Sequence, residues 1–426
     1  MRVSLRSVLG LTVVCVLLSA QAAQAQPFGT ELHNTLMPAS GGMGGVSIAQ
    51  PQDLVSAING NPATLTQFRG TQFHFGGGWA DPTFKMRQTS NIPTVGPTLI
   101  QPFNAKSSAP GTPVGNFGVT QDFSAFGMPA TLGLGFVTSS GGFADFRDVP
   151  QSNGTNMGTV IFNLPIALGV DLTERLSVGA SGSLGIAFFD APYVRHSGMT
   201  PDYAPRGTFG ANYKVGDATT LGAYYQSKQA YNFDNAVQFD PLFLPVQASF
   251  DVRMDLPQNI GFGIANTSLM DGRLLLGIDV LYKLWGDAAL YKAVYNNQWV
   301  VQLGSQYSIG RLRLRSGYVW AENPLRDTPN LNVGGVIQPG GLPAVRYTEG
   351  LLAISSQHRI SAGFGIVDVL PGVDFDVMAG GMFHDSQQLG PFTNTSISSY
   401  WVGAGMTWRF SRGSCCPTGA PNSWCR

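Results

Sequence analysis

Several stretches of the chain alternate between large apolar residues and small or charged residues. In residues 273–285, RLLLGIDVLYKLW, one face is apolar, whereas the other carries Gly277, Asp279 and Lys283. The pattern recurs in residues 311–320, RLRLRSGYVW, and in residues 360–366, ISAGFGI. A period of two is that of a β-strand whose two faces meet different surroundings. The pattern therefore predicts an all-β chain.

Alternation alone fits both a soluble sandwich and a membrane barrel, because an apolar face can meet either a packed core or lipid. The connections favour the barrel. Short polar turns are expected at 171–175, 214–218, 268–272 and 308–310. Long Pro- and Gly-rich connections are expected near 81–113, 189–204, 231–248, 286–297, 321–355 and 384–395. Short turns at one end and long loops at the other, with about fourteen strands, predict a 14-stranded antiparallel transmembrane β-barrel over residues 69–410.

The last predicted strand, residues 399–410, places aromatic residues such as Trp408 and Phe410 on its apolar face, as in an interfacial girdle. It resembles the C-terminal signal by which the barrel-assembly machinery recognises its substrates. Such signals usually end the chain, whereas here a tail of residues 411–426 follows. The tail contains Cys415, Cys416 and Cys425, and an oxidising compartment would permit a disulfide from Cys425 to one of the other two.

The N-terminus reads as a secretory signal. Arg2 and Arg6 precede an apolar run over residues 8–18, and Ala23-Gln24-Ala25 offers a small-x-small cleavage site. We expect residues 1–25 to be removed. Only 12% of the residues are charged, and the formal net charge is zero, so nothing suggests electrostatic binding to nucleic acid. A bacterial outer-membrane location follows from the signal and the barrel together.

Residues 26–68 precede the predicted wall, and the lumen is the natural place for them. Within this segment, ASGGMGGVSIAQPQDLVSAINGNPATLTQF at residues 39–68 resembles the N-terminal hatch of FadL-type outer-membrane transporters of long-chain fatty acids and hydrocarbons. Residues 254–266, 273–285 and 311–324 are also similar, so the likeness covers most of the mature chain. The hatch residues that carry the resemblance are Gly41, Gly42, Gly44, Gly45, Asp53, Asn61, Pro62 and Ala63.

The resemblance implies passive uptake of hydrophobic small molecules through a hatch-gated barrel, with release sideways through an opening in the wall. A lipopolysaccharide layer resists apolar solutes, so such a channel would first extract them from water. The expected partners are the hydrophobic substrate, the lipids and lipopolysaccharide around the barrel, and the assembly machinery, and the protein is expected to be a monomer. The alternatives are a general diffusion porin and a structural barrel.

No catalytic motif is present. The chain lacks the His-Glu-x-x-His zinc motif, a phosphate-cradling Gly-rich loop with Lys, and the Gly-x-Ser-x-Gly elbow. Its five histidines are isolated in the sequence. The sequence therefore predicts no enzyme, no cofactor and no metal site.

Two groups of residues are candidates for binding substrate. An apolar loop surface is expected at residues 239–244, joined by the top of an earlier hairpin, and comprises Phe188, Phe189, Tyr193, Phe239, Leu242, Phe243 and Leu244. Alternation also points Lys283, Arg313 and Arg315 into the lumen, with Asp279, Asp374 and Asp376 as inward carboxylates. Either these charges pair with one another, or one cation, Arg315 or Lys283, is left to meet a substrate carboxylate.

Overall fold

The computed structural model describes residues 33–93, 99–125, 127–190, 199–238, 249–338, 340–352 and 357–410. The predicted signal peptide, the cysteine tail, Tyr193 and the loop residues Phe239, Leu242, Phe243 and Leu244 lie outside these ranges.

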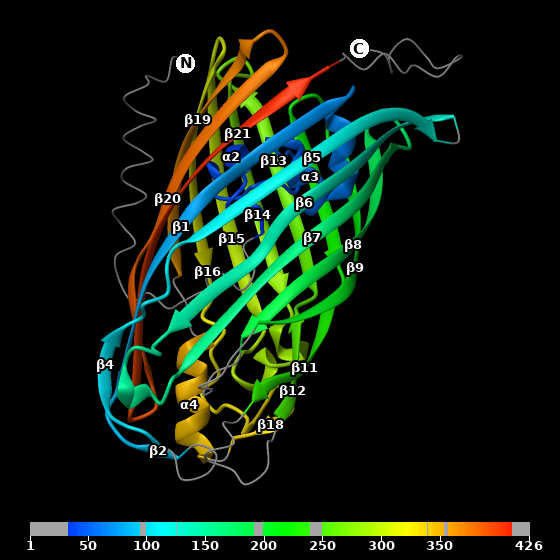
Figure 1. Cartoon of the computed structure of the whole chain (residues 1–426). Helices are drawn as coiled ribbons and strands as arrows, with labels where there is room; N and C mark the ends of the chain where they lie inside the picture. The colour runs from blue at the N-terminus through cyan, green and yellow to red at the C-terminus, as the bar shows by residue number, and fades with distance from the viewer. Residues whose placement is uncertain are drawn as a thin grey trace.

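Fourteen antiparallel strands form one closed barrel, as predicted from the alternation (Figure 1). Each wall strand pairs with the next along the chain, and β1 pairs with β21 over its whole length, from Gln72 opposite Arg409 to Gln88 opposite Thr393. The wall strands are β1 Gln72–Gln88, β5 Thr112–Ala125, β6 Met128–Asp145, β7 Asn156–Asp171, β8 Leu176–Asp190, β9 Thr200–Lys214, β10 Thr219–Gln226, β13 Asn259–Leu269, β14 Leu274–Lys283, β15 Gln298–Ile309, β16 Leu312–Ala321, β19 His358–Leu370, β20 Val373–Leu389 and β21 Thr393–Arg409.

The two ends of the barrel differ. At one end, the turn end, short turns join the strands. The other end, the mouth, carries further elements: β2 Ile92–Pro93, β3 Leu99–Ile100, β4 Phe103–Lys106, η2 Pro150–Ser152, β11 Gln229–Gln238, β12 Ser249–Leu256, η3 Trp285–Asp287, η4 Tyr291–Ala293, β17 Asn332–Val333, β18 Val336–Ile337 and helix α4 Gly341–Leu352 (Figure 1). The long connection expected at 384–395 is wrong. These residues belong to β20 and β21, which a tight turn at Gly390 (φ +62°) joins, with Leu389 opposite Thr393.

The two faces of the wall strands are divided as the sequence predicts. On β14, Leu276 and Ile278 are exposed on the outside, while Asp279 and Lys283 are buried inside. On β21, Tyr400, Val402 and Met406 face outward. A belt of exposed apolar side chains around a closed barrel is the surface that lipid would cover. None of the described helices is long and apolar enough to cross a membrane.

Residues 33–68, the hatch, lie inside the barrel toward the turn end (Figure 1). They form α2 Pro38–Gly41, α3 Leu54–Asn59 and η1 Pro62–Gln67. Helix α2 packs on β1, β19, β20 and β21, α3 packs on β5 to β7, and η1 packs on β6 to β9. The hatch therefore touches the wall on several sides of the lumen.

Glycines of the wall bring the hatch backbone against it. A Cβ added to Gly317 on β16 would lie 2.0 Å from the backbone nitrogen of Gly44, which has φ +75° and donates to the Ser361 hydroxyl at 3.0 Å. A Cβ on Gly210 of β9 would lie 1.9 Å from Oδ1 of Asn61. Glycine is common on the lumen face because any larger residue at such positions would push the hatch away.

The lumen between the hatch and the mouth contains a large cluster of buried apolar side chains. One buried cluster joins Leu36 of the hatch to Phe84 of β1, Phe233 of β11, Trp285 of η3 and Leu351 of α4. Its aromatic rings contact one another, for example Trp285 and Tyr291 with centroids 4.9 Å apart. The interior is thus an apolar region closed at the turn end by the hatch.

Arg206 of β9 fixes the hairpin that folds over this region. Strands β10 and β13 of the wall continue, after two-residue breaks, as the β11 and β12 hairpin. The Arg206 guanidinium donates to the carbonyl of Ser227 at 2.8 Å and to that of Pro257 at 2.6 Å, one in each break. Because both carbonyls leave the wall ladder at this point, the arginine satisfies backbone acceptors that would otherwise be buried without a partner.

Replacing Gly317 with Ala is expected to displace the hatch without preventing the barrel from closing. The new Cβ would overlap the Gly44 backbone, and the hatch can shift to relieve this without breaking the continuous hydrogen-bonded ladder of the wall. Single-channel ion conductance in planar bilayers should therefore rise. Gly182→Ala is the matched control, because nothing lies within 4 Å of a Cβ there. If a Gly317→Ala barrel migrates normally by heat-modifiable electrophoresis and its conductance is unchanged, the close contact between Gly44 and Gly317 does not hold the hatch in place.

Candidate functional site

Asp53 holds the hatch together from within. It is the N-cap of α3, and its carboxylate accepts hydrogen bonds from the backbone N–H of Ser56 at 2.8 Å and of Ser40 in α2 at 2.9 Å. A carboxylate that accepts two backbone N–H groups at a helix start is a favourable cap. Asp53 therefore links α2 to α3.

The Asn61-Pro62-Ala63 triplet joins the hatch to the wall. The Asn61 amide donates to the carbonyl of Ile48 at 2.8 Å and to that of Ala211 on β9 at 3.0 Å. Its Oδ1 accepts from the N–H of Ala63 at 3.1 Å, and Pro62 occupies the first turn of η1, where no N–H is needed. The side chain of Asn61 is fully buried, so each of these bonds replaces one that water would otherwise make.

A second anchor comes from the wall. Asp279 of β14 is fully buried, and its Oδ2 accepts from the hatch N–H groups of Ser47 at 2.6 Å and Ile48 at 2.9 Å. The sequence had pointed this carboxylate into the lumen but paired it with cations. In the structure its partner is the hatch backbone.

Arg315, one of the two favoured head-group candidates, is paired. It is 4% exposed, and its guanidinium donates to Asp376 at 2.5 Å and to Gln306 at 2.7 Å. Lys283 is buried on the lumen face of β14. Arg313 is half-buried near the turn end, where Asp374 and Asp376 attract it. For Arg315, the structure therefore matches the alternative in which inward charges pair.

Arg359 of β19 was missed by the sequence reasoning. It is 4% exposed, faces inward one step from Ser361 toward the mouth, and has neither a hydrogen-bond nor an ion-pair partner among the described residues. Its cross-strand neighbours are Val319 and Met382. Extending the alternation of residues 360–366 by one residue would have found it. A buried guanidinium without a partner, above the hatch and beside an apolar region, is suited to an anionic group.

The aromatic residues at the top of the earlier hairpin are not on a loop surface. Phe188 and Phe189 both belong to β8. Phe189 is 1% exposed and stacks on Phe233 inside the lumen, with centroids 5.1 Å apart, while Phe188 is half-buried on the opposite face. The strand continues farther toward the mouth than the sequence pattern indicated, so Phe189 lines the interior.

The wall has a gap between β5 and β6. These strands pair from Ala125 opposite Met128 only as far as Asn116 opposite Val137. Beyond that point Thr112–Gly115 of β5 pair with β1 alone, and residues 140–145 of β6 pair with β7 alone. A hydrogen bond closes each end of the gap. The Thr138 hydroxyl bonds the carbonyl of Gly115 at 3.0 Å, and the N–H of Ser108 donates to the carbonyl of Asp145 at 2.9 Å.

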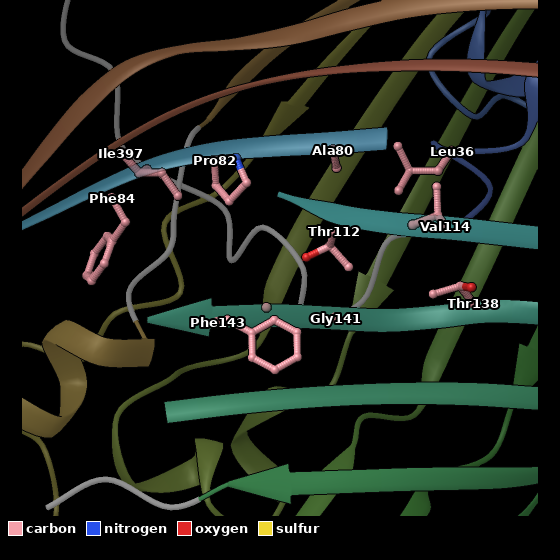
Figure 2. A pocket seen from close by; sticks show the side chains of 11 residues that line it. Leu36, Ala80, Pro82, Phe84, Thr112, Val114, Thr138, Gly141, Phe143 and Ile397 are labelled. Atoms are coloured by element: carbon pink, nitrogen blue, oxygen red, sulfur yellow. The ribbon is translucent and has the colours of Figure 1, made fainter. Parts of the chain in front are cut away.

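An apolar pocket leads from the interior to this gap (Figure 2). Several of its residues, including Leu36 of the hatch and Phe84, belong to the apolar cluster of the lumen. The space open to the centre of a water-sized sphere is about 20 Å³, which is room for one water molecule. The pocket is lined by Leu36, Ala80, Pro82, Phe84, Thr112, Val114, Thr138, Gly141, Gly142, Phe143 and Ile397.

Helix α4 closes much of the mouth and carries a buried ion pair. Arg346 donates to Glu349 at 2.7 Å and also to the backbone carbonyls of Arg326 and Asp327. Glu349 has no exposed surface, and its second oxygen has no hydrogen-bond partner in the described part of the chain. Burial raises the pKa of Glu349 to about 7, although the bond from Arg346 acts in the opposite direction.

Comparison with known proteins found resemblance in structure only. No protein-family model matches the chain, and no curated protein matches it. A Pseudomonas aeruginosa FadL homologue aligns over 92% of this chain and 100% of its own, at 15% identity and a TM-score of 0.68. The P. putida toluene transporter TodX aligns over 89% and 99%, at 17% identity and a TM-score of 0.63. The Ralstonia pickettii toluene transporter TbuX aligns over 89% and 99%, at 14% identity and a TM-score of 0.60.

The chain has the FadL-type fold. The barrel, the hatch and the elements over the mouth are therefore one architecture, shared at low sequence identity. Among the described residues of this FadL-type barrel, no three His, Cys, Asp or Glu side chains are placed to hold a metal ion.

The docking of α4 in this FadL-type barrel is expected to weaken as the pH rises. Glu349 has a folded-state pKa of about 7 against an ordinary value of 4.5, so its contribution to stability is full below pH 4.5 and is lost as the pH rises through 7. After correction for intrinsic rates, amide hydrogen exchange in α4 should be about tenfold faster at pH 8 than at pH 6, because pH 6 lies about one unit below the folded-state pKa of about 7 and one unit corresponds to a tenfold change. Glu349→Gln should remove this pH dependence. Equal dependence in the variant would exclude Glu349 as its source.

Proposed function

We propose that this chain is an outer-membrane channel for the passive uptake of hydrophobic small molecules. One observation supports this most directly: an apolar interior runs from the elements at the mouth to a gap in the barrel wall, above a hatch that fills the axial path. The mouth faces the cell exterior, and the turn end faces the periplasm. Proteins with this fold include transporters described as carrying toluene, which agrees with an apolar substrate.

The first step is capture at the mouth. Leu99, Leu331, Ile337 and Leu342 are large apolar side chains that stand exposed there, the last on α4. Moving an apolar solute from water onto such a surface and then into the interior is favourable by about 0.8 kcal/mol per buried methylene. The solute thus leaves water before it meets the wall or the hatch.

The second step is exit through the gap between β5 and β6. The axial route is closed by the hatch, which Asn61 and Asp279 fasten to the wall. The gap lies beside Leu36, where the apolar interior meets the hatch. A hydrophobic solute that leaves sideways passes directly into the membrane. Its apolar surface is never exposed to water again, so the free energy gained on leaving water at the mouth is not lost. The hatch then serves as the floor of the route, and its displacement would open a second, aqueous path.

The runner-up is a general diffusion porin. Such a channel needs a wide aqueous lumen. The described lumen instead holds the hatch toward the turn end and an apolar cluster toward the mouth. Low ion conductance of the wild-type barrel would support the hydrophobe channel over the porin. A purely structural barrel has no need of an apolar path that ends at a wall gap.

Filling the gap should stop transport. Gly141 borders the gap, and a Cβ there has no atom closer than 3.9 Å, so Gly141→Trp is expected to fold and to place its ring across the opening. Uptake of toluene or oleate by a deletion strain that carries this variant should fall by about tenfold, which corresponds to an added barrier of about 1.4 kcal/mol. Gly182→Trp, on the outer face of β8 with open space around it, should transport normally.

Equal uptake by the two tryptophan variants and the wild type would show that the gap is not the route. If the wild-type channel itself gives no more uptake than the empty strain, the proposed function as a whole is wrong.

We also propose that the channel accepts an acid group at Arg359. The guanidinium is buried above the hatch beside Met382 of the apolar cluster, and no described carboxylate neutralises it. A substrate carboxylate placed there would restore a charge-assisted pair while its apolar tail lay toward the mouth. Arg315, one of the two residues favoured from the sequence, is already paired with Asp376 and Gln306.

The test compares a fatty acid with its matching alcohol. A charge-assisted contact contributes about 1.5 to 3 kcal/mol, so Arg359→Gln should weaken binding of oleic acid about ten- to a hundredfold while oleyl alcohol is little affected. Arg359→Lys should retain part of the preference, and Arg313→Gln, near the turn end, serves as a charge-matched control. Tryptophan fluorescence titration of the purified barrels measures each affinity. Equal binding of acid and alcohol by the wild type would point to uncharged hydrocarbons instead.

A further inference from the structure

Phe143 stands between two pockets that lie on the two sides of the wall gap. The inner pocket, described above, opens from the lumen, and a second pocket of about 330 Å³ lies at the rim between β5, β6 and β7. Thr112 and Phe143 are the residues that line both. Figure 2 shows the Phe143 ring beside Gly141, on the strand opposite Thr112. Any molecule that moves from one pocket to the other therefore passes this ring.

The neighbouring strand provides a seat for the ring. Phe143 of β6 is directly opposite Gly158 of β7, and a Cβ added to Gly158 would lie 2.4 Å from Cδ1 and 2.7 Å from Cε1 of the ring. Glycine at this position thus allows the ring to lie over β7. The ring therefore packs against the backbone of β7 at Gly158.

The size of the inner pocket shows that the ring must move for a substrate to pass. An apolar cavity that binds benzene has a volume of about 150 Å³, whereas the space on the inner side is about 20 Å³. The rim pocket on the far side of the ring has room to receive it after a rotation about χ1. Thr112, on the other edge of the gap, is short and borders both pockets.

We infer that Phe143 is the gate of the wall gap and sets the cross-section of the molecules that leave through it. This inference rests on the proposed function, because it requires that hydrophobic molecules use the gap. It adds a size filter whose moving part is one aromatic ring. Gly158 is the positioning residue, since it defines where the ring rests.

The experiment measures uptake of a narrow and a wide hydrophobe, n-decane and phenanthrene, by a deletion strain that carries each variant. Phe143→Ala should raise the ratio of phenanthrene to decane uptake by about tenfold, in the range that one missing group gives in an apolar pocket. Phe143→Trp should lower that ratio. The matched control is Phe262→Ala, which removes an exposed ring from the outer face of β13, away from the gap.

A second pair of variants tests the seat. Gly158→Ala should push the ring off β7 and change the ratio, whereas Gly158→Ala combined with Phe143→Ala should match Phe143→Ala alone, because the methyl group then meets no ring. Heat-modifiable electrophoresis confirms that each barrel is folded. Decane uptake by the wild type above the empty strain keeps the proposed function intact. If the phenanthrene to decane ratio is then the same in wild type, Phe143→Ala and Phe143→Trp, the gate is excluded.

Discussion

A strand that crosses a bilayer can find partners for its backbone only in other strands, since the hydrocarbon offers none. The rest of this structure depends on that constraint. It requires β1 to meet β21 along its full length, and so encloses a lumen that must then be filled. It also gives meaning to the interval in which β5 and β6 stop pairing with each other. There, Thr138 and the Ser108 backbone bond the groups at the two ends, so the interruption is bounded by specific contacts rather than frayed.

The hatch and the wall are complementary at the level of single atoms. Several wall positions that face the hatch are glycines, as at Gly210 and Gly317, and the hatch occupies the space that a side chain would fill. Buried polar contacts add to this packing, among them the Asn61 amide on the Ala211 carbonyl, the Asp279 carboxylate on two hatch N–H groups and the Gly44 N–H on the Ser361 hydroxyl. Close packing at the wall glycines makes the hatch and the wall complementary in shape, whereas the hydrogen bonds fix the position of the hatch along the wall strands. The combination holds a plug of short helices that would have little stability alone.

The fold was predictable from the sequence because its signals are local. Alternation within one strand determines which residues meet lipid, so Ile278 and Asp279 were assigned to the correct faces before any partner was known. Polar composition was a less reliable guide to loops. At residues 384–395 it indicated a long connection, but these residues belong to the β20 and β21 hairpin, which extends past the wall. Phe189 was misplaced for the same reason, because the length of a strand above the membrane leaves no periodic signal of its own.

The candidate site was less predictable, because it depends on which strands fail to pair and which charges find partners. Pro113 and the Gly141-Gly142 pair weaken the strand pattern at 112–115 and 140–145, but they do not show which neighbouring strands fail to pair. Arg315 and Arg359 look alike in the sequence, yet one has Asp376 and Gln306 and the other has no partner among the described residues. That difference arises only when strands distant in sequence are placed side by side. The hatch motif was recognisable, but its contacts were not.

The position of the hatch in the chain has a consequence for the order of assembly. It is synthesised before every strand that holds it, yet its contacts lie far ahead: Asn61 with Ala211, Ser47 with Asp279, and Gly44 with Ser361, separations of 150, 232 and 317 residues. Contacts so distant form late, because the intervening chain must first be ordered. The hatch, which is synthesised before the wall, is therefore among the last segments to reach its final place. Until the strands have closed around it, it has no cavity to occupy.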